Sequence, residues 1–402
     1  MRQRRQQRKE ERILHAAMGV EIEKTRGRRL FHRGDGVNLH PQAKDLDAGD
    51  FLGEYLLKGW VPPQPVLTRG MKITAFGSCF AANITRNLSA IGYDLSKDRD
   101  PDVYISRMGD GLVNTAAILG QFQWALEDKK PAEALWHDQA AEGQGYDEDI
   151  RLRTRDIFLG TEFFIVTLGL SEIWYDVVTG GTFWRAVPEA AFDPARHKFR
   201  VLSFAETKAD IAEMHRLVRI HVPGAKLLFT VSPIPLAATF RPVSCLTANA
   251  ASKAIIRATL DEFMREHESE LNDSLFYFPS LELVMQGFTD PWESDMRHPE
   301  PYVLDTVMKV FEAAFCKGET SLAQAAHILR MFRAKNLRAI YNRRTDTPEE
   351  RALLSEAKVL KKASRQARRE AIAQQEAVGS AIDFQGEAQK NDTSAGAEDA
   401  AE

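Results

Sequence analysis

The sequence has few cysteines, no strong excess of charge and no long apolar run, and each absence narrows the class of protein. The three cysteines, Cys79, Cys245 and Cys316, lie too far apart to form a disulfide framework, which favours a reducing compartment. No apolar run approaches the roughly 20 residues that cross a bilayer, and the charged N-terminus lacks the apolar stretch of a secretory signal. We therefore expect a cytoplasmic protein without a transmembrane segment.

The composition is that of a globular protein without a bias toward one class of partner. Of the 402 residues, 44% are hydrophobic and 27% are charged, which is enough for one sizeable α/β domain with appendages, or for two domains. A net charge of -4 argues against extensive binding to nucleic acid.

Changes in composition along the chain predict four regions. Residues 1–70 form an irregular, basic extension and linker, and residues 71–317 form an α/β domain. Residues 318–375 form a charged helical extension, and residues 376–402 form a disordered tail, because they are polar and show no periodicity.

Basic residues are concentrated near both ends of the chain, at positions 2–9 and 358–369. Such segments can touch nucleic acid or an anionic membrane surface, but solvated helices and tails more commonly carry this charge. We expect no nucleic-acid partner and leave peripheral membrane contact open.

Strand-like and helix-like segments alternate between residues 71 and 317. Because the strand-like segments are continuously apolar, the pattern predicts a mostly parallel central sheet with helices on both faces, a three-layer α/β/α sandwich. Predicted strands cover residues 72–76, 103–106, 163–168, 226–231 and 275–278, and predicted helices cover residues 80–91, 113–127, 205–221, 249–267 and 301–315.

Polar residues follow the ends of the predicted strands. The segments are residues 77–79, 169–172 and 232–235 and, after a longer loop, 295–298. Because ligand sites in parallel sheets lie outside the carboxyl ends of the strands, we expect all four segments to face one rim.

Two adjacent candidate nucleophiles, Ser78 and Cys79, lie where the first strand meets the helix that follows. Backbone N–H groups at a helix start favour negative charge, which suits a thiolate at Cys79. A serine in this place is commonly the N-cap of the helix, and a cysteine can simply pack behind the turn.

A carboxylate and an imidazole occur at Asp-x-x-His spacing in Asp295 and His298. This spacing lets the carboxylate orient the imidazole within one local turn, so that His298 can act as general base for a nucleophile elsewhere. Together with Cys79 or Ser78 they fit a nucleophile, His and Asp triad.

Several ordered blocks resemble a known family. Phe-Gly-Ser-Cys-Phe-Ala at residues 76–81 is similar to the signature of the GSCFA domain family, and the resemblance spans residues 72–316. Further family-like blocks cover residues 167–174, 230–236, 249–253 and 277–282. The family in turn resembles the SGNH (GDSL-type) hydrolases, which implies a flavodoxin-like fold and cleavage or transfer of acyl groups, commonly on carbohydrates and lipids.

The resemblance also implies roles for single residues. Against the Gly-Asp-Ser block of SGNH hydrolases, Gly77 matches the glycine, Ser78 falls on the aspartate and Cys79 falls on the nucleophile. Asp295 and His298 match the last block of that pattern.

The remaining SGNH blocks imply donors to an oxyanion. The third block places Gly169 at its glycine and Ser171 at its oxyanion-binding asparagine, and the second-block glycine corresponds to Gly111 or to Gly109. The backbone N–H of Cys79 would add a further donor.

These features favour an acyl-transfer enzyme, either an esterase or an O-acyltransferase, acting on a small molecule, a glycan or another hydroxyl-bearing substrate. The chemistry requires no metal or cofactor, and the transferase version would use an acyl donor such as acetyl-coenzyme A. The alternative is a non-catalytic binding or assembly protein that retains the fold.

Other residues carry weaker signals. Trp174 and Trp292 could stack on a sugar, although core or lid packing explains such residues more often. Asn249, Ser252 and Lys253 could approach a substrate from the rim, although a helix start explains them as well.

Overall fold

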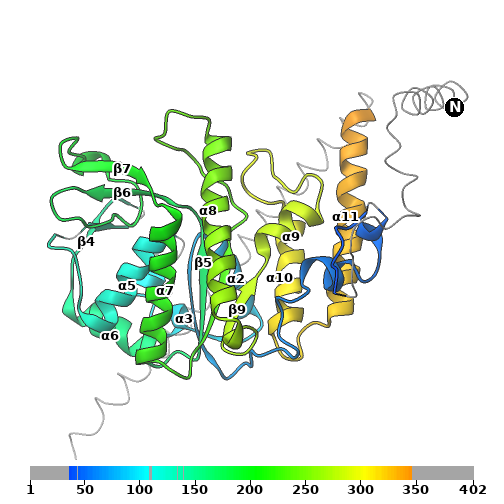
Figure 1. Cartoon of the computed structure of the whole chain (residues 1–402), viewed down its shortest axis with the longest axis horizontal. Helices are drawn as coiled ribbons and strands as arrows, with labels where there is room; N and C mark the ends of the chain where they lie inside the picture. Colours follow the sequence, from blue (N-terminus) through cyan, green and yellow to red (C-terminus); the bar gives the residue numbers. More distant parts are fainter. Residues whose placement is uncertain (1–35, 43, 108–110, 134, 139, 346–402) are drawn as a thin grey trace, which may run out of the picture.

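The computed structural model describes residues 36–345, except for residues 43, 108–110, 134 and 139. Its centre is a five-stranded parallel sheet with the strand order β2-β1-β5-β8-β9 (Figure 1). The strands are β1 (Lys72–Gly77), β2 (Asp94–Leu95), β5 (Phe163–Leu168), β8 (Lys226–Val231) and β9 (Leu275–Phe278). Counted along the chain, this is the 2-1-3-4-5 order of flavodoxin-like, doubly wound sheets. The predicted α/β fold with a parallel sheet is confirmed.

Helices cover both faces of the sheet, as the two buried hydrophobic clusters show (Figure 1). Helices α5, α6, α7 and α8 contribute to one cluster, and α2, α9, α10 and α11 contribute to the other. The helices are α2 (Cys79–Ala90), α3 (Ser96–Arg99), α4 (Tyr104–Arg107), α5 (Thr115–Glu127), α6 (Glu148–Leu159), α7 (Phe204–His221), α8 (Cys245–Glu266), α9 (Ser280–Gly287), α10 (Pro301–Phe315) and α11 (Leu322–Thr345). The three-layer sandwich therefore follows from strands that are apolar on both faces.

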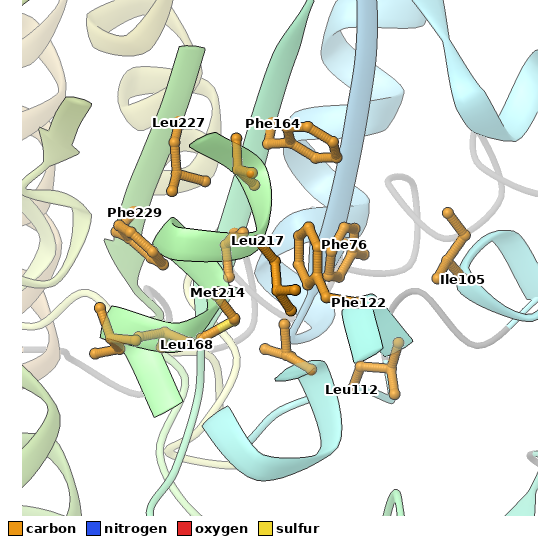
Figure 2. Close-up of a cluster of buried hydrophobic side chains, with 14 of the residues drawn as sticks. Phe76, Ile105, Leu112, Phe122, Phe164, Leu168, Met214, Leu217, Leu227 and Phe229 are labelled. Carbon is orange, nitrogen blue, oxygen red and sulfur yellow. The ribbon is translucent and has the colours of Figure 1, made fainter. Parts of the chain in front are cut away.

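The cluster under α5 and α7 holds the C-terminal half of β1 in place (Figure 2). Phe76 of β1 lies with its ring centroid 5.7 Å from that of Phe122 on α5. Phe229 of β8 and Met214 of α7 belong to the same cluster. The residue before the Gly-Ser-Cys turn is thus fixed by aromatic packing.

Shorter elements decorate the sheet. An antiparallel hairpin of β6 (Glu172–Asp176) and β7 (His197–Val201) follows β5, and β3 (Trp136–His137) pairs with β4 (Gly143–Gln144). The single-turn helices are Asp45–Asp47, Leu52–Leu56, Glu189–Ala191 and Glu268–Glu270. The β6–β7 hairpin matters for function because it stands at the rim where the strands end.

The predicted strand at residues 103–106 is wrong, because Tyr104–Arg107 is a helical turn, α4. Val103, Tyr104 and Ile105 are buried, and the Tyr104 ring stacks on Trp124 at 5.5 Å. A buried apolar run this short has no periodicity that separates a strand from a helix.

The sequence predicts an irregular N-terminal extension at residues 1–70, but part of this extension packs into the core. Phe51, Leu52 and Leu57 are buried in the cluster that also contains α10. Leu67 bonds through its backbone N–H to the Phe315 carbonyl at 2.7 Å. The packed unit therefore extends beyond the predicted boundary at residue 71.

At the other end, α11 (Leu322–Thr345) forms part of the predicted helical extension, residues 318–375. Ala325, Ala326 and Leu329 pack into the α10 side of the core. The remainder of the predicted helical extension and the predicted tail, residues 346–402, lie outside the described residues, as do both basic segments, residues 2–9 and 358–369. Over the described part of the chain, no helix combines the length and the apolar character that a membrane span requires.

Candidate active site

The turn after β1 is held by close contact with β5. Gly77 adopts a φ of +141°, and a Cβ atom built there would lie 2.1 Å from the Thr167 carbonyl oxygen. The Ser78 backbone N–H donates to the same oxygen at 3.1 Å. Only glycine satisfies both the dihedral and the contact, so the backbone conformation of this turn requires glycine at position 77.

Ser78 and Cys79 differ in their surroundings. Ser78 is 5% exposed and is the N-cap of α2, since its hydroxyl accepts the Phe80 backbone N–H at 3.2 Å. Cys79 is the first residue of α2 and is exposed. The N-cap alternative for Ser78 is thus confirmed, whereas the buried packing role weighed for Cys79 is not what the structure shows.

The other two thiols are placed differently. Cys316 is buried, and burial raises the pKa of its thiol to about 12. Cys245 lies at the start of α8, with its sulfur 3.7 Å from the Leu236 carbonyl oxygen. They provide internal references for any test of Cys79 reactivity.

Asp295 and His298 form the local pair that their spacing predicts. The Asp295 Oδ2 atom lies 2.5 Å from His298 Nδ1, and Oδ1 accepts the backbone N–H groups of His298 at 3.0 Å and Arg297 at 2.9 Å. The pKa of the Asp295 carboxyl is held well below its usual range. The largest cause is the bond from the His298 backbone N–H, followed by the bond from the Arg297 N–H and the contact with the imidazole. With Nδ1 engaged, Nε2 is the ring nitrogen available for proton transfer.

This turn is a surface feature. The His298 and Asp295 side chains are 49% and 45% exposed. Its base is closed by the Glu293 N–H donating to the His298 carbonyl at 2.7 Å and by a bridge between Trp292 and Pro299. Trp292 therefore helps to close the base of this turn. It is not among the residues that line the two cavities described next.

Two cavities meet at Cys79. The larger, about 690 Å³, is lined by Cys79, His298 and residues of α2 and α10. The smaller, about 340 Å³, is lined by Ser78, Cys79 and Gly169, together with residues of the segments after β8 and around Arg297. All four rim segments thus contribute to this one region, as the strand ends predicted.

The expected oxyanion donors need correction. The Gly169 N–H donates to the Val113 carbonyl at 2.7 Å. The Ser171 N–H donates to Ser252 Oγ at 2.7 Å, its hydroxyl lies 3.1 Å from the same atom, and the buried residue does not line either cavity. These N–H groups stabilise the rim rather than face a substrate. Gly111 does line the smaller cavity and forms an isolated antiparallel β-bridge with Ser78. Gly109 lies outside the described residues.

Sequence reasoning missed Asn114. This residue is the N-cap of α5, is 2% exposed and lines the smaller cavity beside Cys79. Its Oδ1 accepts the Ala117 N–H at 2.8 Å, and this bond does not use the donors of the side-chain amide nitrogen. In the sequence, an asparagine before a helix is indistinguishable from an ordinary cap.

Helix α8 clamps the rim from behind. Lys253 is buried and donates through Nζ to the carbonyl oxygens of Gly169 at 2.6 Å, Ser232 at 2.7 Å and Ile234 at 2.9 Å. Burial lowers the pKa of this ammonium group to about 7, yet three carbonyl acceptors require all three of its N–H bonds. Asn249 Oδ1 accepts the Leu236 N–H at 3.1 Å. Helix α8 thus ties together the loops after β5 and β8. The expected helix start at Asn249 is wrong, because α8 begins at Cys245 and its N-cap is Ser244.

Glu172 and Trp174 project from β6 toward the smaller cavity. Glu172 Oε1 accepts the Thr239 hydroxyl at 2.9 Å, the structural hydrogen bond expected of it. Burial raises the pKa of the Glu172 carboxyl. Trp174 lines the cavity and does not belong to either buried hydrophobic cluster.

Among the described residues, one group of three side chains could hold a metal: His215, His267 and Glu270. Arg219 donates to Glu270 Oε2 at 2.8 Å, and His215 Nε2 lies 3.0 Å from the same oxygen. A cation would compete with this guanidinium, so the cluster is explained as an Arg–Glu–His network. His221 also lies on α7 but does not belong to this group.

The chain was compared with protein families, curated proteins and solved structures. An acetyl xylan esterase (Est2A) from the rumen bacterium Butyrivibrio proteoclasticus is similar with a TM-score of 0.31 and 12% identity, over 68% of this chain. The match spans 66% of the esterase, slightly less than two thirds of its length. No curated protein matches the chain. The model of the GSCFA family matches residues 72–311, more than half of the sequence and the whole of the central sheet. The chain therefore belongs to the GSCFA family.

Proposed function

We propose that the chain is an acyl-transfer enzyme, an esterase or an O-acyltransferase, in which Cys79 is the nucleophile. The observation that carries the proposal is that the exposed Cys79 thiol, at the start of α2, shares a cavity with an imidazole whose Nδ1 is held by Asp295. Ser78 is the weaker candidate, because its hydroxyl is buried and serves as the helix cap.

In the proposed reaction, the Cys79 sulfur attacks the acyl carbonyl carbon and its proton passes to His298 Nε2. The carbonyl oxygen becomes an oxyanion, which the start of α2, Gly111 and the Asn114 amide would stabilise. Collapse of this intermediate expels the alcohol oxygen, which takes the proton from His298 and leaves a Cys79 thioester.

Breakdown of the thioester repeats these steps in reverse. Water, or a hydroxyl of an acceptor, loses a proton to His298 Nε2 and attacks the thioester carbonyl. The thiolate leaves and recovers the proton, releasing a carboxylic acid or a new ester. Asp295 keeps its charge throughout and stabilises the imidazolium. We propose a carbohydrate or another hydroxyl-bearing molecule as acceptor, with acetyl-coenzyme A as a donor to be tested for the transferase version.

A thiol-reactive probe tests the proposal directly. We expect Cys79 to label faster than Cys245 at neutral pH, and we expect His298→Ala to slow Cys79 labelling without changing Cys245. Equal rates at the two thiols would support the alternative, a non-catalytic binding or assembly protein. Hydrolysis of a short acyl ester in water alone would then distinguish an esterase from a strict transferase.

A further inference from the structure

The two cavities that meet at Cys79 differ in chemical character. The larger has a mixed lining, in which polar side chains such as Asn83 and His298 lie beside apolar ones such as Leu304 and Met308. The smaller is lined largely by apolar side chains, which include Leu170, Trp174, Phe199, Leu236 and Phe240. A substrate that spans Cys79 would therefore meet a mixed surface on one side and a largely apolar surface on the other.

The apolar wall is built from aromatic rings. The Trp174 ring centroid lies 4.7 Å from that of Phe240 and 5.7 Å from that of Phe199, and Phe199 lies 5.4 Å from Phe240. Trp174 and Phe199 come from the β6–β7 hairpin, and Phe240 comes from the loop after β8. Phe240 is 61% exposed, so much of its ring surface is accessible from solvent.

Three charged side chains also line the smaller cavity, and each contacts other protein atoms. Glu172 accepts the Thr239 hydroxyl, and Arg297 Nη2 donates to the Pro235 carbonyl at 3.4 Å. The Arg185 guanidinium lies against the Gly111 backbone, since a Cβ atom on Gly111 would be 2.2 Å from its Nε. Most of the other lining side chains are apolar, and the leucines and the three rings are among them.

We propose that the two cavities divide the substrate, with an acyl chain of several carbons in the smaller cavity and the hydroxyl-bearing part in the larger. The inference rests on the proposed function and adds the class of acyl group to it. Of the two cavities, His298 lines only the larger, where an alcohol oxygen would need to receive or lose its proton. The acyl carbonyl would sit between them, at Cys79.

The size of the apolar cavity sets the length of the chain. A cavity of about 150 Å³ accommodates benzene, a six-carbon ligand. The smaller cavity, about 340 Å³, therefore has room for an acyl chain on the order of eight carbons, far more than an acetyl group needs. Burial of each methylene should raise kcat/KM by about fourfold until the cavity is filled.

Two matched substitutions test this division. Ala238 and Ala82 line the smaller and the larger cavity respectively, and neither is buried, so a tryptophan at either position should allow folding. With the full chain and aryl esters of two to twelve carbons, we expect kcat/KM to rise with chain length to about eight carbons. Ala238→Trp should lower the octanoyl to acetyl ratio by more than tenfold, whereas Ala82→Trp should lower turnover of both esters by the same factor.

Binding without catalysis separates this inference from the proposed function. With Cys79→Ala protein, we expect octanamide to change tryptophan fluorescence, and we expect Ala238→Trp, but not Ala82→Trp, to abolish its binding. Octanamide binding in a chain that turns over no ester would contradict the proposed function alone. A preference for acetyl esters, or a chain-length profile altered only by Ala82→Trp, would overturn the division of the substrate.

Discussion

The two halves of the proposed catalytic group are held in different ways. The turn at Gly77, Ser78 and Cys79 is built into the sheet, through a glycine pressed against β5 and a backbone bond to Thr167. The Asp295 and His298 turn is a half-exposed surface loop that organises itself through its own carboxylate. We infer that disruption of the first turn should destabilise the whole fold. Disruption of the second turn should lower activity without lowering stability.

The largest expected effect concerns the nucleophile. Cys79→Ala should lower kcat by a factor on the order of 10⁴ or more, because no thioester can form. Ser78→Ala should retain most of the activity and cost about 1 kcal/mol of unfolding free energy, the usual effect of losing an N-cap. Ester kinetics and denaturant unfolding measure the two quantities, and the reverse pattern would assign the chemistry to Ser78.

Asp295→Asn should lower kcat by about 10³, because an amide at this position can donate to Nδ1 and would favour the wrong imidazole tautomer. Its thermal midpoint should stay close to that of the parent protein, since the side chain is half exposed. Steady-state kinetics and thermal unfolding on the same sample check both statements. A marked loss of stability would show that this turn supports the fold after all.

Gly77→Ala should cost about 3 kcal/mol or more of unfolding free energy, because the new methyl group meets the Thr167 carbonyl at a dihedral that alanine rarely adopts. Gly92→Ala is the matched control, since Gly92 also has a positive φ, +84°, but no atom within 4 Å. The control should cost about 1–2 kcal/mol. Equal losses in urea unfolding would mean that the contact with β5 is not tight.

Lys253→Met should cost about 2–3 kcal/mol of unfolding free energy, because three buried carbonyls lose their donor. It should also lower kcat about tenfold by loosening the loops after β5 and β8, although Lys253 touches no substrate. Lys208→Met, at a partly exposed lysine paired with glutamates, serves as control and should cost less than 1 kcal/mol. If both substitutions cost the same, Lys253 is not a clamp.

Stability should also depend on pH through a carboxyl whose pKa is shifted in the opposite direction from that of Asp295. Burial raises the pKa of Asp210 to about 6, although the Thr115 hydroxyl donates to it at 2.6 Å. Since the folded state holds this proton more tightly than the unfolded chain, the group costs stability as pH rises from about 4 to 6. Asp210→Asn should therefore add about 3 kcal/mol above pH 7 and little at pH 4, which thermal unfolding at the two pH values measures. A gain that is equal at both values would contradict the raised pKa.

Sequence patterns predicted what depends on local order along the chain. The run at residues 163–168 is apolar at every position but one and forms a strand in which every residue is buried. The Asp295 to His298 spacing predicted a contact within one turn. The strand ends converge because parallel strands share an edge, and this topology follows from alternation alone.

Contacts between distant segments could not be predicted in this way. The Gly169 N–H is used by Val113 and the Ser171 N–H by Ser252, and neither pairing leaves a mark in the local sequence. Asn114 enters the site only because its helix cap lies beside the first strand end. The burial of Phe51 and Leu57 likewise depends on packing against distant residues of the core, and an irregular segment has no sequence pattern that predicts such packing.

The most direct test of Cys79 as nucleophile is the position of a trapped acyl group. After brief reaction of the full chain with an activated octanoyl ester and acid quenching, peptide mass spectrometry should find the octanoyl adduct on Cys79 of the parent protein. The adduct should persist in Ser78→Ala and be absent from Cys79→Ala. An adduct on Ser78, or ester turnover that continues in Cys79→Ala, would contradict the account.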